Sequence, residues 1–418
     1  MPYTLLLGSF VIRYPDRPRE GPEPEGDTIK FRPDTPALVE GLRRLSGRPP
    51  DINLRGVTVR LEAIDALEAQ FGQTHQNLIV AHGARDELLR QLGFTNVSFF
   101  DDLPNRVQAA DQDEVRGHLL SNGIDANGHV VAWVYPGEHP DPDGAQVSLD
   151  EDLLLKSVNV RLLDGGWVYP LFHTTLAPLI LAYLEAPSKI ARINQLGMWR
   201  RSTADPDRLA TITDPADLEE LIIWPKLFRR VVPYLASGFT DFDSFDAWLR
   251  DDPIHRDDEL FFLQSPRRKR GNLHDVVRGS GQQLQLTVWP EDFAFSPDPP
   301  PGGGTGPQQL GVGDVLIVAA LPDPTGIDGG GELVTLVNVT ASPIELTGWG
   351  LVDAAGGRKD LAGRLAAGGV IQVTAEGALT LGDEGDRITL VDPRGRSIDQ
   401  VTYTANRVRP GRTICFGR

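Results

Sequence analysis

The sequence contains very little cysteine, few aromatic residues and no long apolar run. Cys415 is the single cysteine among the 418 residues, which excludes an internal disulfide framework. No stretch approaches the roughly 18 uninterrupted apolar residues that a membrane-spanning helix needs. The N-terminal apolar run has no cationic region ahead of it, so we expect a strand there and no signal peptide, with a cytoplasmic location by default.

Positive charge is also scarce. The chain has 41 Lys and Arg against 58 Asp and Glu, a formal net charge of −17. A protein that coats nucleic acid needs clustered Lys and Arg, so this balance argues against such a coat. It leaves room for a hydrolase, because a hydrolase needs only a local groove and a divalent ion, and metal-binding carboxylates add to the negative count.

The chain has enough apolar residues, 40%, to build several soluble cores, and its length predicts two to four domains. Residues 296–309, SPDPPPGGGTGPQQ, cannot propagate a helix or a strand ladder, so we expect a linker there. A softer boundary falls at residues 202–207, where two prolines interrupt helical patterns. The expected parts are residues 1–203, a small mixed helical and strand region of unknown role at 204–295, the linker 296–309, and residues 310–418.

The first part begins with three strand patterns, TLLLGSFVIRY, GDTIKF and VTVRLEAI. Residues 72–92 have the apolar periodicity of a helix, and GHLLSNGIDANGHVVAWVY is typical of a hairpin. LDEDLLLK and residues 176–196 then predict further helices. Five short strands with a helix after the third favour an α+β domain built on a small, partly open barrel of the OB type, the oligonucleotide/oligosaccharide-binding fold.

The last part is strand-rich throughout. Its strand patterns are DVLIVAAL, ELVTLVNV, IELTGWGLVD, VIQVT, ALTL, RITLVD and SIDQVTY, and about seven short strands at this spacing favour a two-sheet all-β sandwich. The region 204–295 is mixed α/β. Its segment DPADLEELIIWPKLFRRVVPYL predicts a helix interrupted at Pro233, and GQQLQLTVW alternates like an edge strand.

Charged residues gather on the strand patterns of the first part. Asp27 lies beside a turn at a strand start, and Arg60, Glu62, Asp65 and Glu68 lie within nine positions. Two aspartates, a backbone oxygen and water suit a hard divalent ion such as Ca²⁺, and a nearby Arg and Glu could hold a phosphate and orient a water. The other interpretation is a row of ion pairs on a solvated strand, and spacing alone favours it.

The order of the motifs points to the first interpretation. GDTIKF, then VTVRLEAIDALE, a long helix, DANGHVVAWVY, and finally GGWVYPLF with GMW at residues 197–199 resemble the staphylococcal-nuclease-like (thermonuclease) family over nearly all of residues 1–203. The resemblance implies that Asp27, Asp65 and the carbonyl of Ala66 hold Ca²⁺. It further implies that Glu68 acts as general base on the attacking water and that Arg60 stabilises the phosphate in the transition state.

Departures from the family pattern leave two interpretations open. The second phosphate-binding Arg of the family falls on His129, and neutral imidazole lacks the bidentate fork of a guanidinium. His129 could act as a phosphate donor or as the acid for the leaving group, which keeps a Ca²⁺-dependent nuclease acting on DNA or RNA. Alternatively, the chain is a catalytically degenerate binding protein with the same fold. About twenty extra residues after the second strand carry Arg43, Arg44 and Arg48, which could replace the missing cation or remain solvated.

Two aromatic residues and one basic cluster complete the candidates. Trp167 and Tyr169 could stack on bases of a bound strand, although core packing is the other explanation, especially for Trp167. The cluster RRKR at residues 267–270 could contact phosphates, but a solvated loop is the expected account. His173, His274 and Cys415 have no companions at metal-ligand spacing, so no zinc site is expected.

The last part resembles the bacterial lamin-tail-domain family through ELVTLVNVTASPIELTGWGLVDAAG and GDRITLVDPRGRSIDQVTY. The resemblance implies an immunoglobulin-like module that binds a protein or a surface and targets the rest of the chain. Trp349 is expected to fill the space between the sheets, and Asn338 to satisfy the backbone of a turn. Neither residue is expected to be catalytic.

Overall fold

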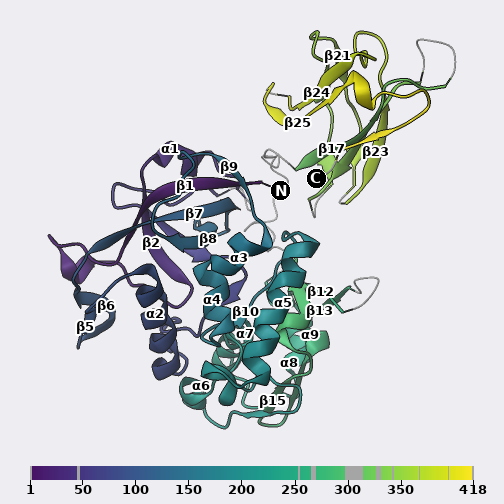
Figure 1. The fold of residues 1–418 in the computed structure, drawn as a ribbon. Helices are drawn as coiled ribbons and strands as arrows, with labels where there is room; N and C mark the ends of the chain where they lie inside the picture. The colour runs from purple at the N-terminus through teal and green to yellow at the C-terminus, as the bar shows by residue number, and fades with distance from the viewer. Residues whose placement is uncertain are drawn as a thin grey trace. The chain divides into compact units, whose positions relative to one another are not determined.

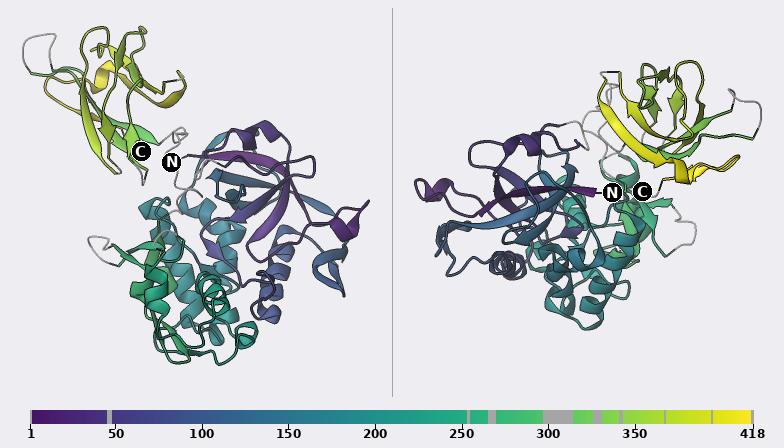
Figure 2. Two further views of the ribbon diagram at one scale, coloured as in Figure 1. Left: turned by 180° about the vertical axis from the view of Figure 1, so that it is seen from behind. Right: turned by 45° about the horizontal axis from the view of Figure 1, so that its top comes forward.

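The computed structural model describes residues 2–44, 48–252, 255–264, 270–296, 314–325, 331–340, 343–366, 368–393 and 395–416. The chain divides into two compact units, residues 1–305 and residues 306–418 (Figures 1 and 2). The expected linker, 296–309, lies almost entirely outside the described residues, as do Arg267, Arg268 and Lys269 of the basic cluster. Among the described residues, no helix is both long and apolar enough to cross a membrane.

A closed barrel of five strands forms the first half of unit 1–305. Its hydrogen-bonded order is β1–β2–β3–β8–β7 and back to β1, with β3 and β8 parallel and the other neighbours antiparallel. This arrangement is compatible with an OB-like fold. The strands are β1 (Pro2–Val11), β2 (Thr28–Pro33), β3 (Val57–Leu61), β7 (Glu114–Ile124) and β8 (Val130–Pro136), and β9 (Gln146–Ser148) extends the sheet beyond β1.

The barrel closes at β1, which pairs with both β2 and β7. Gly8 of β1 lies opposite Gly117 of β7 and opposite Pro33 of β2. A Cβ atom on Gly117 would lie 2.2 Å from the ring of Phe10, and one on Gly8 would lie 2.3 Å from the carbonyl oxygen of Arg32. Glycine is therefore required at this corner, where two backbones and an aromatic ring approach one another.

The helices within residues 151–193 cover one side of the barrel. α4 packs on β8 and on α2, and α5 packs on α4. The helix expected at residues 72–92 begins only at Leu78, because the side chain of Asn77 accepts a hydrogen bond from the N–H of Val80 and caps it. The elements are α1 (Pro36–Glu40), α2 (Leu78–Leu92), α3 (Glu151–Lys156), α4 (Val158–Asp164) and α5 (Pro178–Ile193), with a hairpin of β5 (Ser98–Phe100) and β6 (Leu103–Ala109).

Residues 204–296 contribute short helices and two three-stranded sheets. The helix expected to break at Pro233 instead breaks earlier, into α6 (Asp217–Glu220) and α7 (Pro225–Ala236), and Pro233 lies inside α7. GQQLQLTVW forms the central strand β15 of its sheet, not an edge. The other elements are β11 (Ala210–Thr211), α8 (Phe245–Arg250), β12 (Glu259–Phe262), β13 (Arg270–Asn272), α9 (Leu273–Val276), β14 (Val277–Ser280), β15 (Gln283–Leu286) and β16 (Phe293–Phe295).

This region shares one hydrophobic core with the chain before residue 204. Tyr169, Leu171 and Trp199 pack in the same buried cluster as Trp224 and Phe228. The pair formed by β4 (Ile64–Asp65) and β10 (Tyr169–Pro170) contributes to this junction, because Tyr169 belongs to the shared core and Asp65 forms an ion pair with Arg229 of α7. Within the interval 202–207, Ser202 and Ala204 are buried and Ala204 belongs to this shared core.

Unit 306–418 is built from two four-stranded sheets, ordered β23–β18–β17–β26 and β21–β20–β24–β25, with a small pair β19–β22. Trp349 is buried in its core. The amide of Asn338 donates to the carbonyls of Leu365 and Ala366 and accepts from Thr340, so it satisfies turn backbone as expected. The segment ALTL forms no strand. The strands are β17 (Val315–Leu321), β18 (Leu333–Asn338), β19 (Ile344–Glu345), β20 (Gly350–Val352), β21 (Arg358–Asp360), β22 (Arg364–Leu365), β23 (Val370–Thr374), β24 (Gly385–Val391), β25 (Ser397–Thr404) and β26 (Ile414–Cys415).

Candidate functional site

The carboxylates that the sequence singles out meet beside the barrel. Asp65, at the end of β4, is completely buried, and Arg60 of β3 places its Nη2 atom 3.4 Å from the Asp65 Oδ1 atom. Asp27 is also buried, 7% exposed. Its Oδ2 atom accepts a hydrogen bond from the N–H of Ala66 at 3.1 Å, and its Oδ1 atom accepts one from the hydroxyl of Thr28 at 2.9 Å.

The centre of this cluster is an arginine that the sequence did not single out. Arg229 of α7 donates from Nη2 to both Asp65 oxygens, at 2.7 Å and 3.0 Å, and from Nη1 to Glu68. Burial lowers the pKa of Arg229, but the charges of Asp65 and Glu68 together raise it above its ordinary value. One guanidinium therefore bridges two carboxylates and stays charged.

Burial has the largest effect on the pKa of three carboxyl groups in this region, Glu25, Asp27 and Glu68. Burial raises the pKa of Asp27, against the lowering effect of Arg60, and burial raises the pKa of Glu68, against that of Arg229. Glu25 has its pKa raised to about 8 by burial and by the charges of Asp27 and Glu68. Such carboxyl groups bind protons more readily than exposed ones because water no longer stabilises their charge.

Glu68 is held by a second residue that the sequence analysis passed over. The buried side chain of Gln76 accepts from the N–H of Glu68 at 3.1 Å and donates to the carbonyl of Ile223 at 2.8 Å. It thus ties the Glu68 loop to the segment that leads into α7. No periodicity or motif marks Gln76, because its role depends on two backbone groups that are far apart in the sequence.

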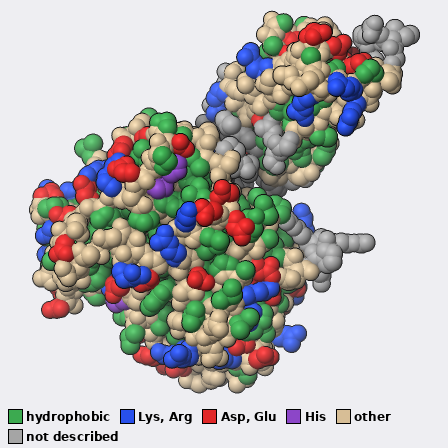
Figure 3. Space-filling view, viewed as in Figure 1, with side chains coloured by type: hydrophobic (Ala, Val, Ile, Leu, Met, Phe, Trp, Pro, Cys, Tyr) green, Lys and Arg blue, Asp and Glu red, His purple; other side chains and the backbone are tan. Residues whose placement is uncertain are grey.

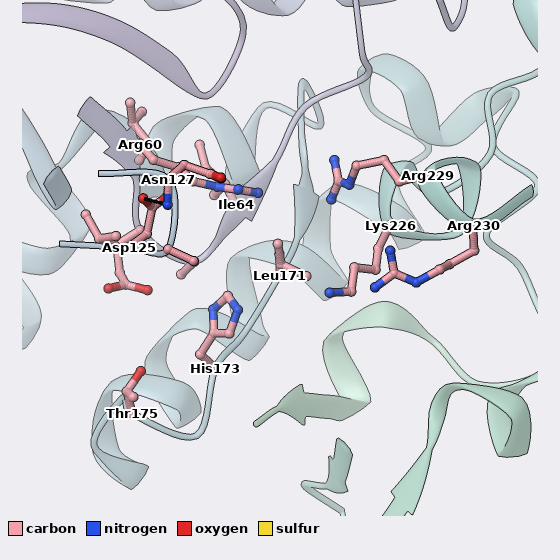
Figure 4. Close-up of a pocket in the computed structure, with 15 residues that line it drawn as sticks. Arg60, Ile64, Asp125, Asn127, Leu171, His173, Thr175, Lys226, Arg229 and Arg230 are labelled. Atoms are coloured by element: carbon pink, nitrogen blue, oxygen red, sulfur yellow. Dashed lines mark hydrogen bonds between the residues drawn. The ribbon is translucent and has the colours of Figure 1, made fainter. Parts of the chain in front are cut away.

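A cavity of about 300 Å³ opens beside this cluster, between the barrel and α7 (Figure 4). Lys226, Arg229 and Arg230 of α7 line it opposite Arg60. They lie at positions i, i+3 and i+4, which share one face of a helix. This spacing is the one pattern in the sequence that could have indicated a cationic helix face here. The other lining residues include Glu62, Asp125, Asn127, His173 and Thr175.

Buried carboxylates hold the cavity's cations in place. Asp258 accepts from Lys226 Nζ at 2.7 Å and from Arg230 Nη2 at 2.7 Å, and Asp65 and Glu68 do the same for Arg229. Burial raises the pKa of Asp258, but Lys226 and Arg230 together bring it below its ordinary value. Asp27, Asp65 and Glu68 are absent from the residues that line the cavity, so they lie behind the guanidinium groups.

Glu62 lines the cavity, and its pKa lies near neutrality. Burial raises its pKa to about 7, while the N–H of Ala63 and the charge of Arg60 lower it. Four cationic side chains therefore line the cavity, whereas its acidic lining residues are Asp125 and the partly protonated Glu62. On the face displayed in Figure 3, Lys and Arg are interspersed with Asp and Glu.

The remaining candidate residues lie outside the cavity lining. His129 faces Asp125, with Nδ1 3.3 Å from Oδ2. Trp167 is partly buried and packs against the barrel core. Tyr169 is completely buried, and its hydroxyl lies 2.6 Å from the Ser202 hydroxyl oxygen, so a base has no access to its ring. Of the extra arginines, Arg43, Arg44 and Arg48, none lines the cavity.

The residues expected to hold Ca²⁺ do not fit that ion in this arrangement. Ca²⁺ requires six to eight oxygen ligands, whereas both oxygens of Asp65 and both of Asp27 already accept hydrogen bonds from the protein. Within the part of the chain that the structure describes, no group of three or more His, Cys, Asp or Glu is placed to hold a metal ion.

Comparison with known proteins identifies the C-terminal part. Residues 308–405 match the family model of the lamin tail domain, which confirms the expectation for that part of the chain. No nuclease family matches the N-terminal barrel. No curated protein matches the chain.

Proposed function

We propose that unit 1–305 binds the phosphodiester backbone of a nucleic-acid strand in the cavity between the barrel and α7. The observation that carries the proposal is the lining of that cavity, where Arg60, Lys226, Arg229 and Arg230 outnumber the carboxylates in a chain of net charge −17. Guanidinium groups form paired, charge-assisted hydrogen bonds with phosphate oxygens. Cations gathered in a cavity attract an anion more strongly than the same cations spread over a surface.

The buried carboxylates support this function by orienting the cations. Arg229 is fixed by Asp65 and Glu68, and Lys226 and Arg230 are fixed by Asp258. A phosphate that enters the cavity therefore meets donors that are already in position. It also competes with those carboxylates, so we expect weak binding, with a dissociation constant on the order of 10⁻⁴–10⁻⁶ M and a strong dependence on salt.

A second candidate function is hydrolysis of the bound phosphodiester. It is favoured by the position of Asp27 and Asp65 beside Arg60, with Glu68 close to both aspartates, as the resemblance to thermonucleases implies. In that reaction the oxygen of water bonds to phosphorus and the bond from phosphorus to the leaving oxygen breaks. Glu68 takes a proton from the water, and the leaving oxygen takes one from solvent. Glu68 would have to leave Arg229 for this step, and for that reason binding without turnover is the first proposal.

The C-terminal unit is proposed to target the chain to a protein or a surface, in keeping with its lamin-tail match. Because both units belong to one chain, such targeting would raise the local concentration of the cavity near ligands at that location. The measurement is retention of the full chain and of residues 1–305 on the same cell-surface or protein fraction. Equal retention of both would contradict a targeting role.

The test of the cavity uses fluorescein-labelled single-stranded DNA and RNA with the full chain, followed by anisotropy for binding and by gel for cleavage. Arg60→Gln and Lys226→Gln should each weaken binding about tenfold, the effect of roughly 1.4 kcal/mol. Arg192→Gln is the matched control, since Arg192 is a half-buried helical arginine paired with the buried Glu291 outside the cavity. Equal affinity of all four proteins would refute the proposal.

The same samples decide between binding and hydrolysis. Cleavage by the wild type that is lost in Glu68→Gln would establish the second candidate. Binding without cleavage, in calcium and in EDTA alike, would support the first. Both outcomes are read from one gel and one titration, so neither function is inferred from the other.

A further inference from the structure

The carboxylate of Asp65 is contacted by two guanidinium groups of the protein. Its carboxylate is completely buried and receives both of its shortest contacts, 2.7 Å and 3.0 Å, from the Nη2 atom of Arg229. Arg60 lies slightly farther away, at 3.4 Å. A divalent ion at these oxygens would meet the repulsion of the guanidinium charge, which already takes their closest hydrogen-bonding positions.

The same guanidinium also neutralises Glu68. The Nη1 atom of Arg229 donates to Glu68 while Nη2 serves Asp65, so one planar group spans both carboxylates. Its side chain is only 19% exposed, and a guanidinium group does not lose its proton in proteins. The positive charge is therefore permanent, and it stands between the two carboxylates that a metal ion would otherwise bridge.

Arg229 is anchored in this position by the fold. It lies 161 residues after Glu68 and 164 residues after Asp65. The Gln76 side chain connects Glu68 to Ile223, and the Asn77 side-chain amide donates to the carbonyl of Glu220 at 3.3 Å. These bonds hold the start of α7 against the loop that follows β4, and so they fix the guanidinium in place.

We propose that Arg229 takes the place of a divalent cation at Asp65 and Glu68, so that the site contains a built-in positive charge and excludes Ca²⁺. Anion binding in the cavity then needs no metal. This last consequence rests on the proposed function, whereas the exclusion of Ca²⁺ rests only on the contacts of Arg229. The replacement of Arg229 by a neutral side chain would free both carboxylates for an ion.

The test is calcium binding by isothermal titration calorimetry on the full chain, without nucleic acid. The wild type and the control Arg192→Gln should bind no Ca²⁺ at this site up to millimolar concentration. Arg229→Gln should gain one site with a dissociation constant on the order of 10⁻⁴–10⁻³ M, and the double variant Arg229→Gln/Asp65→Asn should lose it again. Circular dichroism checks that each variant is folded.

Two results would overturn the proposal. One is a wild-type Ca²⁺ site that Asp65→Asn abolishes, since the ion would then coexist with Arg229. The other is a folded Arg229→Gln variant that binds no calcium. If Arg229→Gln does not fold, the comparison of the wild type with Asp65→Asn still decides whether Ca²⁺ is excluded. Because the titration contains no nucleic acid, a failure of strand binding would leave this result unaffected.

Discussion

The ion pairs of Arg229 predict a large and specific loss of stability when the arginine is removed. Arg229→Met keeps most of the side-chain volume but leaves Asp65 buried without its closest partner. Removal of one partner from a buried ion pair costs about 3–5 kcal/mol. Arg60 remains 3.4 Å from Asp65 and compensates in part, so the expected loss in the free energy of unfolding is near the lower end, about 3 kcal/mol.

The assay is urea unfolding of the full chain at pH 7, followed by tryptophan fluorescence. Six of the seven tryptophans lie in unit 1–305, so the signal reports mainly that unit. With a slope of about 3 kcal/mol per molar urea for a protein of this size, the midpoint should fall by about 1 M. Arg250→Met is the control, because Arg250 and Asp246 are both 55% exposed and such pairs contribute about 0.5 kcal/mol or less.

The double variant Arg229→Met/Asp65→Asn separates loss of packing from loss of charge balance. If the buried charge causes the instability, neutralisation of Asp65 should make the double variant more stable than Arg229→Met alone. The reasoning is refuted if Arg229→Met unfolds within about 0.3 M urea of the wild type, about 1 kcal/mol. It is also refuted if the double variant is no more stable than the single one.

Three further predictions concern other parts of the chain. The pKa of Glu62 in the folded protein, about 7, exceeds its value in the unfolded chain. Glu62 therefore stabilises the fold at low pH, and this contribution is lost as pH rises from about 4.5 to 7. Glu62→Gln should therefore make the free energy of unfolding fall less steeply between pH 5 and 7, by up to about 1.4 kcal/mol per pH unit. An equal difference between the urea midpoints at pH 5 and at pH 7 in the variant and in the wild type would contradict this prediction. Lys226→Gln should lower the slope of log affinity against log salt for single-stranded DNA by about 0.7, one phosphate contact; an unchanged slope would place Lys226 away from the strand. Asn338→Ala should cost unit 306–418 about 2 kcal/mol and lower its calorimetric melting temperature by about 10 °C, whereas a shift in unit 1–305 alone would be unexpected.

Much of the fold could be predicted from the sequence because the strands carry their own periodicity. The barrel strands and the sandwich strands alternate or run apolar, and the glycines and prolines between them mark their ends. The segment ALTL was wrongly predicted to be a strand, because its two leucines are buried without a strand partner. GQQLQLTVW was predicted as an edge strand since its exposed glutamines alternate with buried leucines, a pattern that a central strand of a one-sided sheet shows equally well.

Only the part of the candidate site that lies on or beside neighbouring strands could be predicted from the sequence. Asp27, Arg60, Asp65 and Glu68 lie on or beside neighbouring strands, so strand order alone brings them together. Arg229 could not be placed, because its contact with Asp65 depends on how α7 packs over β4, and packing between distant segments leaves no local pattern. The expectation of Ca²⁺ was made from the carboxylates alone, and it stays a prediction that the calcium titration tests.

The shared core of unit 1–305 ties the site to the cooperative folding of the whole unit. The barrel supplies Arg60 and the carboxylates, α7 supplies Arg229, and Trp224 and Phe228 pack α7 onto Leu171. A fragment that ends at residue 203 would keep the motifs that resemble thermonucleases, yet it would expose this apolar surface and leave Asp65 without its closest counter-charge, Arg229. Local unfolding of α7 would likewise dismantle the cavity while the barrel strands persist. A ligand that bridges Arg60 and α7 would oppose that opening and shield the chain from proteolysis in proportion to its occupancy.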